Sequence, residues 1–424
     1  MNDVSDVALP HVVIIGGGFA GLWAARALSD APVRITMLDR GNHHLFQPLL
    51  YQVATAGLSA PDIAAPLRQI LRRQENVTVL MEEVDAIDPA ARRVTLTDGR
   101  HIDFDYALLA TGATHAYFGH DEWAEHAPGL KSLDDALDIR RRILSAFERA
   151  EATDDLDERK ALLTFAIVGG GPTGVELAGT MAEIARHTLN GEFRHIDPAH
   201  SQVMLLEAGP RVLSSFDPDL SEKARLQLEH LGVEVLTGTP VASIDGKGVQ
   251  VGERHIPART VLWAAGVAAS PLARTLGVPL DRAGRVSVES DLAVPGHPHV
   301  FVAGDLASVQ SDGRPVPGVA PAAKQMGRHV ADTIRARLAG QPATHFRYRD
   351  FGNLATIGRM AAVVQVGRWK LSGALAWWFW LWAHVFFLIG FRNRLVVMLN
   401  WTWAYWTYQR AARIILGKDP EAGR

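Results

Sequence analysis

The residues with the clearest chemical meaning are glycines that occur twice in the same pattern. Residues 15–21 read Ile-Gly-Gly-Gly-Phe-Ala-Gly, and residues 168–174 read Val-Gly-Gly-Gly-Pro-Thr-Gly. In this pattern the first glycine permits a tight turn, the second lets the backbone approach a pyrophosphate, and the third lets a helix pack close to a strand. The phosphates then lie at the positive N-terminal end of that helix. The repeat predicts two dinucleotide sites, which we assign to Gly16, Gly18 and Gly21 and to Gly169, Gly171 and Gly174.

The elements that must position these glycines are also repeated. Apolar runs at residues 12–15 and 165–168 precede the two turns, and a helical pattern rich in Ala and Leu follows each. This order of strand, turn and helix is the beginning of a Rossmann-like unit. Plain glycine turns in an α/β fold are the alternative, and the two matched contexts argue against it.

An acidic residue ends the next predicted strand in each unit. Asp39 follows residues 33–38, and Glu207 follows residues 203–206, with the longer second spacing assigned to a loop at residues 187–199. Such an acid accepts hydrogen bonds from a ribose diol and repels a 2′-phosphate. The second site is therefore predicted to take NADH rather than NADPH, although Arg211 is close enough to leave NADPH open.

Three more segments fit a redox enzyme with FAD in the first site and NADH in the second. Residues 107–113 and 261–266 are matching strands that end in small residues, and they assign Thr111 and Gly112 to FAD and Ala265 and Gly266 to NADH. Residues 300–305 form a buried strand that delivers Asp305 at its carboxyl end, where ligands bind in open α/β sheets. Asp305 is expected to bind the ribityl chain of the flavin; its alternative role is that of a helix N-cap.

Cysteine is absent from the 424 residues. This absence excludes a disulfide scaffold, a thiolate zinc site, an iron–sulfur cluster and any thiol-based redox relay. The close histidine groups at 43–44 and 297–299 have no ordered set of further ligands, so no metal is expected. The formal net charge of −3 gives no reason to expect nucleic-acid binding.

The C-terminal part of the chain differs from the rest. Residues 359–424 carry nine Lys/Arg and two Asp/Glu, and eight of the eleven tryptophans lie between Trp369 and Trp406. Residues 374–391 are nearly all apolar, but tryptophans lie within this run and basic residues flank both of its ends. We therefore expect this segment, and a second helix over residues 395–416, to lie in the plane of an anionic membrane surface. A buried core or dimer contact is the alternative.

The N-terminus leaves no room for a secretory signal, because only ten residues precede the first strand. We therefore expect the protein to stay on the cytoplasmic side.

On these motifs the chain resembles the two-dinucleotide-binding flavoproteins, and more narrowly the type II NADH:quinone oxidoreductases. The narrower resemblance rests on residues 44–55, His-Leu-Phe-Gln-Pro-Leu-Leu-Tyr-Gln-Val-Ala-Thr, and on the tryptophan-rich tail. It implies a single-subunit respiratory NADH dehydrogenase that passes electrons from NADH through FAD to a quinone, such as ubiquinone, without pumping protons. It also implies a peripheral, monotopic enzyme on the cytoplasmic face of a bacterial inner membrane, and allows a homodimer.

The resemblance also implies roles for individual residues. Glu176, two residues into the second helix, is expected near the nicotinamide and the flavin, where it holds or relays protons; the alternative is that it stabilises the helix N-terminus. Gln52 is assigned to FAD, and Gln325 to the quinone side of the flavin. The family often has Ala-Gln-x-x-x-Gln at this place, and here Pro321 replaces the first glutamine.

The predicted fold is therefore α/β, with two Rossmann-like dinucleotide-binding domains and a C-terminal amphipathic helical membrane anchor. The expected divisions are an FAD domain at residues 8–131 and 285–358, a helical linker at 132–159, an NADH domain at 160–284 and an anchor at 359–424. Within the FAD domain we expect a small antiparallel excursion through residues 77–80, 93–97 and 102–107. Two other functions stay open: a soluble NADH:ferredoxin-type reductase, and a flavin- and NAD-binding membrane-associated redox regulator.

Overall fold

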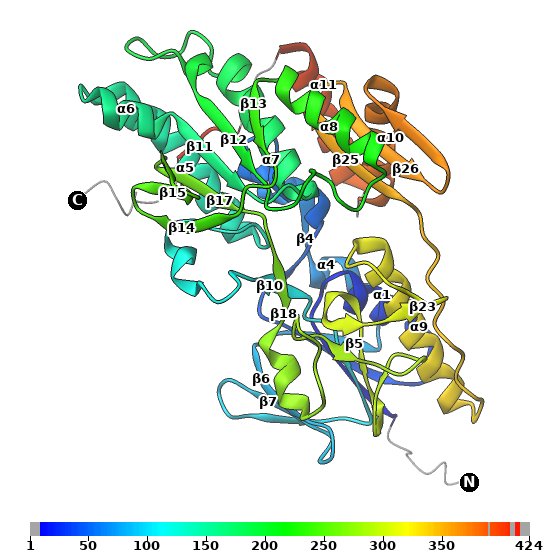
Figure 1. Ribbon diagram of the computed structural model, residues 1–424. Helices are drawn as coiled ribbons and strands as arrows, with labels where there is room; N and C mark the ends of the chain where they lie inside the picture. Colours follow the sequence, from blue (N-terminus) through cyan, green and yellow to red (C-terminus); the bar gives the residue numbers. More distant parts are fainter. Residues whose placement is uncertain (1–8, 389–390, 408–411, 416–424) are drawn as a thin grey trace, which may run out of the picture. The chain divides into compact units, whose positions relative to one another are not determined.

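A computed structural model of the chain describes residues 9–388, 391–407 and 412–415. These residues fall into two units (Figure 1). The first unit holds residues 9–45, 64–114 and 267–350, and the second holds residues 46–63, 115–266 and those described from 351 onward. The domain limits expected from the sequence stay a prediction.

The first unit is built on a six-stranded sheet in which all neighbours are parallel except the edge pair β20–β21. In sheet order its strands are β20 (Ala293–Val294), β21 (His297–Val302), β9 (Tyr106–Leu109), β1 (His11–Ile15), β2 (Arg34–Asp39) and β5 (Val77–Met81). All five residues of β1 are buried, as expected for a central strand that is covered on both faces. The predicted first Rossmann-like unit is confirmed.

The helices of this unit include α1 (Phe19–Ala27), α4 (Leu67–Leu71) and α9 (Ala320–Leu338). Helices α1 and α9 pack so closely that a Cβ at Gly327 would lie 2.1 Å from the carbonyl oxygen of Ala20. A separate antiparallel sheet contains β6 (Val84–Asp88), β7 (Arg93–Leu96) and β8 (His101–Asp103).

One expectation about the excursion was wrong. Residues 77–80 do not belong to it, because they form β5, which pairs in parallel with β2 at the edge of the main sheet. Residues 102–107 also divide, since 102–103 belong to β8 and 106–107 to β9. The short apolar run at 77–80 has no periodicity that separates a parallel edge strand from an antiparallel one.

The second unit repeats the plan with four parallel strands. In sheet order they are β13 (Val233–Leu236), β12 (Gln202–Leu206), β11 (Thr164–Val168) and β17 (Thr260–Trp263). An antiparallel sheet of β14 (Val241–Asp245), β15 (Gly248–Val251) and β16 (Arg254–Pro257) belongs to the same unit. The predicted second Rossmann-like unit is confirmed.

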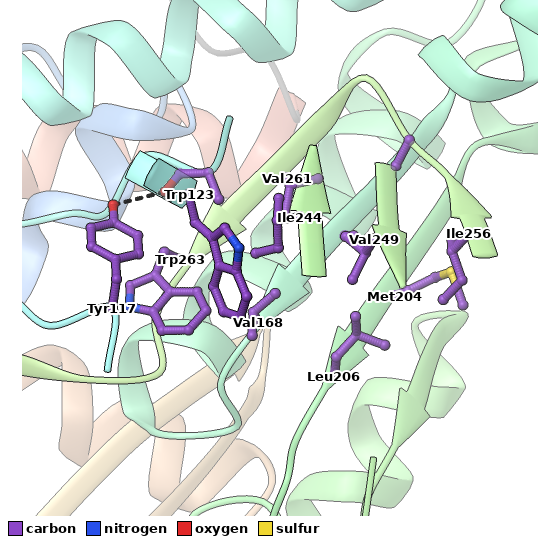
Figure 2. Close-up of a cluster of buried hydrophobic side chains, with 13 residues drawn as sticks. Tyr117, Trp123, Val168, Met204, Leu206, Ile244, Val249, Ile256, Val261 and Trp263 are labelled. Carbon is purple, nitrogen blue, oxygen red and sulfur yellow. Dashed lines mark hydrogen bonds between the residues drawn. The ribbon is translucent and has the colours of Figure 1, made fainter. Parts of the chain in front are cut away.

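Aromatic residues close one end of the core of this unit (Figure 2). Tyr117 stacks on Trp263 with ring centroids 5.1 Å apart, and Trp123 meets Trp263 edge-on. The Tyr117 hydroxyl donates to the carbonyl oxygen of Ala127 at 2.9 Å, so the buried phenol is satisfied.

The helices of the second unit are α2 (Leu50–Ala54), α3 (Ala60–Ile63), α5 (Leu133–Ala152), α6 (Leu156–Leu162), α7 (Pro172–Glu183), α8 (Pro218–His230), α10 (Ala374–Phe387) and α11 (Phe391–Thr407). Helix α5 is the helix expected after Ser132. A capping box begins it: the Ser132 hydroxyl accepts from Asp135 N at 3.1 Å, and the Asp135 carboxylate accepts from Ser132 N at 2.9 Å.

The C-terminal part of the second unit starts with an antiparallel sheet of β25 (Asn353–Gly358), β26 (Ala361–Val366) and β27 (Trp369–Ser372). Helix α10 ends at Phe387, before the end of the apolar run. The predicted second helix is present as α11 up to Thr407, and the rest of that prediction lies partly outside the described residues. Where the chain is described, no helix has the length and apolar character to cross a membrane.

The remaining short strands are β3 (His43–Leu45), β4 (Ala64–Pro66), β10 (Ala113–His115), β18 (Val267–Ala269), β19 (Val286–Ser287), β22 (Ala307–Ser308), β23 (Gln310–Ser311) and β24 (Arg314–Pro315).

Candidate functional site: two nucleotide cradles and a buried carboxyl group

The first glycine-rich turn links β1 to α1, and packing inside the protein requires two of its glycines. Gly16 has a φ of +103°, and a Cβ there would lie 2.4 Å from the carbonyl oxygen of Ala110. A Cβ at Gly21 would lie 1.9 Å from the carbonyl oxygen of Gly16. No larger residue fits at either position, so the tight turn and the close helix–strand contact are as predicted.

Gly18 has a different environment. The nearest described heavy atom to a Cβ built there is the carbonyl oxygen of Ala110, 4.0 Å away. Gly18 is the N-cap of α1, and no side chain caps this helix end. The N-terminal end of α1 and the open space at Gly18 form a cradle that fits a pyrophosphate.

The second turn, between β11 and α7, has the same division of roles. Gly169 has a φ of +109°, and a Cβ at Gly174 would lie 1.8 Å from its carbonyl oxygen. At Gly171, in contrast, a Cβ would have no heavy atom of the described residues within 4 Å. Helix α7 begins with Pro172, whose fixed φ suits the first helical position.

The acid that ends the second strand of each unit is held by backbone N–H groups. In the first unit the Asp39 carboxylate accepts from Gly17 N at 2.6 Å and from Gly41 N at 2.7 Å. The second unit repeats this with Glu207, which accepts from Gly170 N at 2.5 Å and from Gly209 N at 2.6 Å. Each acid is thus fixed beside its glycine turn, with lone pairs left for a ribose diol.

Three further residues assigned to FAD follow strands of the same parallel sheet. Thr111 and Gly112 follow β9, and Asp305 follows β21. The Thr111 hydroxyl oxygen is buried and has no partner among the described residues, which is unusual in a folded protein. Gly112 has a φ of +68° and open space where a Cβ would stand. These groups fit a ligand at the carboxyl edge of the sheet.

Asp305 lies in a short 3-10 turn, Gly304–Leu306, and is partly exposed. The N-cap of this turn is Ala303, and no side chain caps it, so the N-cap alternative for Asp305 is wrong. Within the described part of the chain, the Asp305 carboxylate makes no hydrogen bond, which leaves it available to a hydroxyl-bearing ligand.

Gln325 lies on α9, and its amide is occupied by backbone groups. Its Nε2 donates to the carbonyl oxygens of Pro321 at 3.2 Å and Arg349 at 3.0 Å, and its Oε1 accepts from Arg349 N at 2.9 Å. Pro321 lies in the first turn of α9, where a missing N–H costs nothing. Gln325 therefore fastens residue 349 to α9, and its roles toward flavin and quinone stay predictions.

Glu176 is buried in the first turns of α7. Burial raises the pKa of its carboxyl group well above the ordinary value, and a hydrogen bond from the backbone of Thr356 opposes this only in part. A buried carboxyl group with a raised pKa is suited to giving and taking protons.

Gln52 connects α2 to the C-terminal helices of the second unit. Its Oε1 accepts from the indole Nε1 of Trp401 at 2.7 Å, and its Nε2 donates to the hydroxyl of Tyr51 at 2.8 Å. No sequence pattern indicates this link, and the assignment of Gln52 to FAD stays a prediction.

Ala265 and Gly266 follow β17, at the carboxyl edge of the second sheet. A Cβ at Gly266 would lie 2.5 Å from the ring of Phe118, and the Gly266 carbonyl oxygen accepts from Ala116 N at 3.2 Å. The structure thus explains the glycine by local packing, and the NADH role of both residues stays a prediction.

Two buried polar groups were missed by the sequence reasoning. His44 Nδ1 lies 2.9 Å from the carbonyl oxygen of Gly17, so Nδ1 carries the proton, and Nε2 is a buried acceptor without a described partner. Arg140 on α5 is 8% exposed, makes no described ion pair or hydrogen bond, and has its pKa lowered by burial. His44 opens the 44–55 motif and Arg140 stands in no motif, but only the three-dimensional packing reveals that each is a buried polar group.

No group of three or more acidic or histidine side chains lies close enough to bind a metal ion in the part of the chain that the structure describes.

Two glycine cradles, each with an acid fixed beside it, define a protein that binds two dinucleotides. The family model described as pyridine nucleotide-disulphide oxidoreductase matches residues 10–327. The chain is 48% identical over 415 residues to the type II NADH:quinone oxidoreductase Ndh of Mycobacterium tuberculosis, covering 94% of this chain and 89% of that protein. It is 49% identical over 408 residues to NdhA of the same organism, covering 92% and 86%.

Among solved structures, NDH2 from Plasmodium falciparum in complex with NADH has the same fold, with a TM-score of 0.87 at 18% identity over 96% of this chain and all of that one. The sulfide:quinone oxidoreductase of Aquifex aeolicus follows at a TM-score of 0.72 and 19% identity, covering 91% and 92%. The chain belongs to the pyridine nucleotide-disulphide oxidoreductases and, within them, to the type II NADH:quinone oxidoreductases.

Proposed function

We propose that this chain oxidises NADH, passes the electrons through bound FAD to a membrane quinone, and pumps no protons. The observation that carries the proposal is the pair of nucleotide cradles together with the buried Glu176 on the helix of the second cradle. Family membership leaves the ferredoxin-type alternative without support.

Three observations indicate that the first cradle fits FAD. A Cβ at Gly18 would face open space. The buried Thr111 hydroxyl and the Asp305 carboxylate have no hydrogen-bond partners among the described residues. The residues that would hold it are Gly16, Gly18, Gly21, Asp39, Thr111, Gly112 and Asp305. When bound, FAD supplies the two-electron redox chemistry between a nicotinamide and a quinone.

The protein's own part is to bind, orient and move protons. The chain has no cysteine, so a thiol-based redox relay between the nicotinamide and the flavin is excluded. Reducing a quinone consumes two protons. Glu176 is buried and its pKa is raised well above the ordinary value, so it is the group we assign to holding a proton for this step.

The preference for NADH follows from Glu207. Its carboxylate is fixed by two backbone N–H groups, so it cannot swing away from a 2′-phosphate. Arg211, the nearest candidate cation in the sequence, donates from Nη2 to the carbonyl oxygen of Ser214 at 3.0 Å, and its Nη1 is buried without a partner among the described residues. The negative charge at Glu207 therefore decides the choice in favour of NADH.

The membrane part of the proposal rests on exposed aromatic groups in α10 and α11 and at the start of β27. Single exposed apolar residues are ordinary, but a concentration of large ones marks an interaction surface. We call this set the aromatic surface; its most exposed members are Trp369, Trp382, Phe386, Trp403 and Trp406, which are 59–78% exposed. Tryptophan prefers the headgroup region, so we propose that these helices lie on an anionic leaflet on the cytoplasmic side.

The same helices also have a buried side that attaches them to the second unit. Trp380 is 2% exposed and packs against Trp401 of α11 with ring centroids 5.4 Å apart, and His384 meets the ring of Phe46 edge-on at 6.3 Å. Burial lowers the pKa of His384 to about 4, so this imidazole is neutral at physiological pH and places no charge in the contact. One face thus packs on the protein, and the other is the exposed face that we assign to the lipid.

Two measurements test this function. Steady NADH oxidation with a soluble quinone is expected, whereas a redox regulator would show none. The proposed membrane binding is tested with a variant in which Trp382, Trp403 and Trp406 are all replaced by serine. Co-sedimentation of this variant and of the wild type with phosphatidylglycerol vesicles is measured at low and high salt. Binding should be lost in this variant and only weakened by salt in the wild type, because buried aromatic area is not screened.

The matched control replaces three exposed apolar residues elsewhere, Met81, Leu156 and Leu226, with serine. It should bind vesicles as the wild type does. Equal sedimentation of the tryptophan variant and the wild type would contradict the anchor and favour a contact between copies of the chain.

A further inference from the structure

Helix α7 and strand β25 pack against each other, and their backbones come into contact at Gly179. A Cβ at Gly179 would lie 1.6 Å from the carbonyl oxygen of Ile357 and 2.7 Å from its carbonyl carbon. Real Cβ atoms essentially never approach other atoms below 3.0 Å, so even alanine would force the two elements apart. Gly179 plays no part in the glycine motif of the nucleotide cradle.

This contact has a consequence one helical turn earlier. Glu176 and Gly179 are three residues apart and therefore lie on the same side of α7. Thr356 and Ile357 are neighbours on β25, so the contact at Gly179 brings the backbone of Thr356 to the Glu176 carboxyl group, to which it is hydrogen-bonded. The side of α7 that meets β25 continues to Glu183, whose carboxylate accepts from the backbone N–H of Arg359.

The hydrogen bond is the only described interaction that favours the charged form of Glu176. Burial is the larger effect and favours the neutral form. Strands β11, β12 and β25, which pack against α7, carry no titratable side chain. The other elements packed against α7 do carry titratable groups, but none of these groups contributes to the pKa shift of Glu176. They are Tyr51 on α2, Glu234 on β13, Arg186 and His187 after α7, and the charged residues of α8. The proton affinity of Glu176 thus depends on how close β25 lies.

We propose that Gly179 is a positioning residue: by letting β25 touch α7, it holds the Thr356 backbone N–H on Glu176 and so sets the pH at which Glu176 gives up its proton. Strand β25 opens the sheet that leads into α10 and α11. The C-terminal part of the chain is therefore more than an attachment to a membrane, because its first strand tunes a group of the second nucleotide unit. The consequence for quinone reduction rests on the proposed function, but the positioning itself does not.

The test is an infrared titration of the purified holoenzyme, in which the protonated carboxyl band that is absent from Glu176→Gln reports Glu176. Gly179→Ala pushes β25 away from α7, and Thr356→Pro removes the backbone N–H without adding an atom to α7. In each variant the midpoint of the Glu176 titration should rise by about one pH unit, because one hydrogen bond to the charged form of Glu176 is lost. If one of these two variants does not fold, the other still tests the proposal. Proline is tolerated at strand irregularities, and β25 has one between Thr356 and Gly358.

Two controls separate positioning from general damage. Thr356→Val removes the side-chain hydroxyl but keeps the backbone N–H, so the midpoint should not move. Gly327→Ala creates a comparable clash, 2.1 Å from a carbonyl oxygen, in the other unit and should also leave the midpoint in place. An unchanged midpoint in Gly179→Ala and Thr356→Pro overturns the proposal. A shifted midpoint with an unchanged pH profile of quinone reduction supports the positioning and contradicts the role we assign to Glu176.

Discussion

The two nucleotide units are built alike up to a single position two residues after the third glycine. In both, the first and third glycines are required by backbone contacts, the second faces open space, and an acid is fixed by two glycine N–H groups. At the position that follows, the first unit has Trp23 and the second has Glu176. The repeat thus builds the binding cradle twice, and the chemistry differs at one residue.

The surroundings of that position differ as much as the residues do. Around the Trp23 ring lie three cations: Lys324 Nζ at 3.8 Å, and the guanidinium carbons of Arg328 and Arg26 at 4.5 and 5.1 Å. Burial, and then the charges of Arg328 and Arg26, lower the pKa of Lys324. Glu176, in contrast, has only a backbone hydrogen bond among the described residues, in an apolar setting. Of these two positions, only the one in the second unit therefore carries a side chain that can hold and release a proton.

The largest effect is expected at this position. Glu176→Gln should lower the rate of quinone reduction about 100-fold or more, the usual loss when a group that transfers protons is removed. Trp23→Phe, its counterpart in the first unit, should change the rate little. Steady-state kcat with a soluble quinone checks both, and similar losses in the two variants would remove the distinction between the units.

The same substitution should also affect stability, in the opposite direction. The pKa of Glu176 is higher in the folded than in the unfolded protein, so the protein is most stable when Glu176 is protonated in both states, below about pH 4. The free energy of unfolding then falls as the pH rises towards and through the folded-state pKa. Glu176→Gln should therefore be more stable than the wild type at about pH 8, with the difference shrinking towards about pH 4. Urea unfolding at several pH values measures this, and a constant difference would contradict the raised pKa.

The next effect concerns the first unit. Asp305→Ala should remove the charge-assisted hydrogen bond that we propose Asp305 makes to FAD. Such a bond is worth about 1.5–3 kcal/mol, which corresponds to a roughly 10- to 150-fold weaker affinity. The variant should purify with less FAD and regain it at high FAD concentration, while NADH binding to the second unit is retained. Full occupancy and unchanged FAD affinity would show that Asp305 is not a ligand.

A smaller effect tests whether Gly18 and Gly171, the second glycines of the two motifs, have the same role in binding a nucleotide. Gly171→Ala should fold normally, because the protein leaves room for the methyl group, and should weaken NADH binding by about tenfold, or ~1.4 kcal/mol. Gly18→Ala should do the same to FAD and leave NADH binding in place. Equilibrium titration with each nucleotide measures this, and cross-effects between the sites would break the comparison.

The smallest effect is expected for nucleotide choice. Glu207→Gln keeps the size of the side chain but removes its negative charge, so the efficiency with NADPH should rise several-fold relative to NADH. The ratio of kcat/KM values checks this. An unchanged ratio would place the discrimination at another residue.

The sequence predicts the parts that depend on local pattern. The glycine spacing, the strand-ending acids Asp39 and Glu207, and Asp305 at the end of a buried strand all follow from short runs of neighbouring residues. The contact of Gly179 with Ile357 does not, because it joins positions far apart in the chain and leaves no periodicity in either segment. The hydrogen bond of Gln52 with Trp401 was missed for the same reason.

The most direct test of the central claim follows the flavin itself under anaerobic conditions. The purified protein should be yellow, NADH should bleach the flavin absorbance, and a soluble quinone added afterwards should restore it rapidly. Recovery at a rate at least equal to steady-state turnover is the predicted result. A flavin that NADH does not bleach, or that stays bleached in the presence of quinone, would contradict the assignment of this chain as an NADH:quinone oxidoreductase.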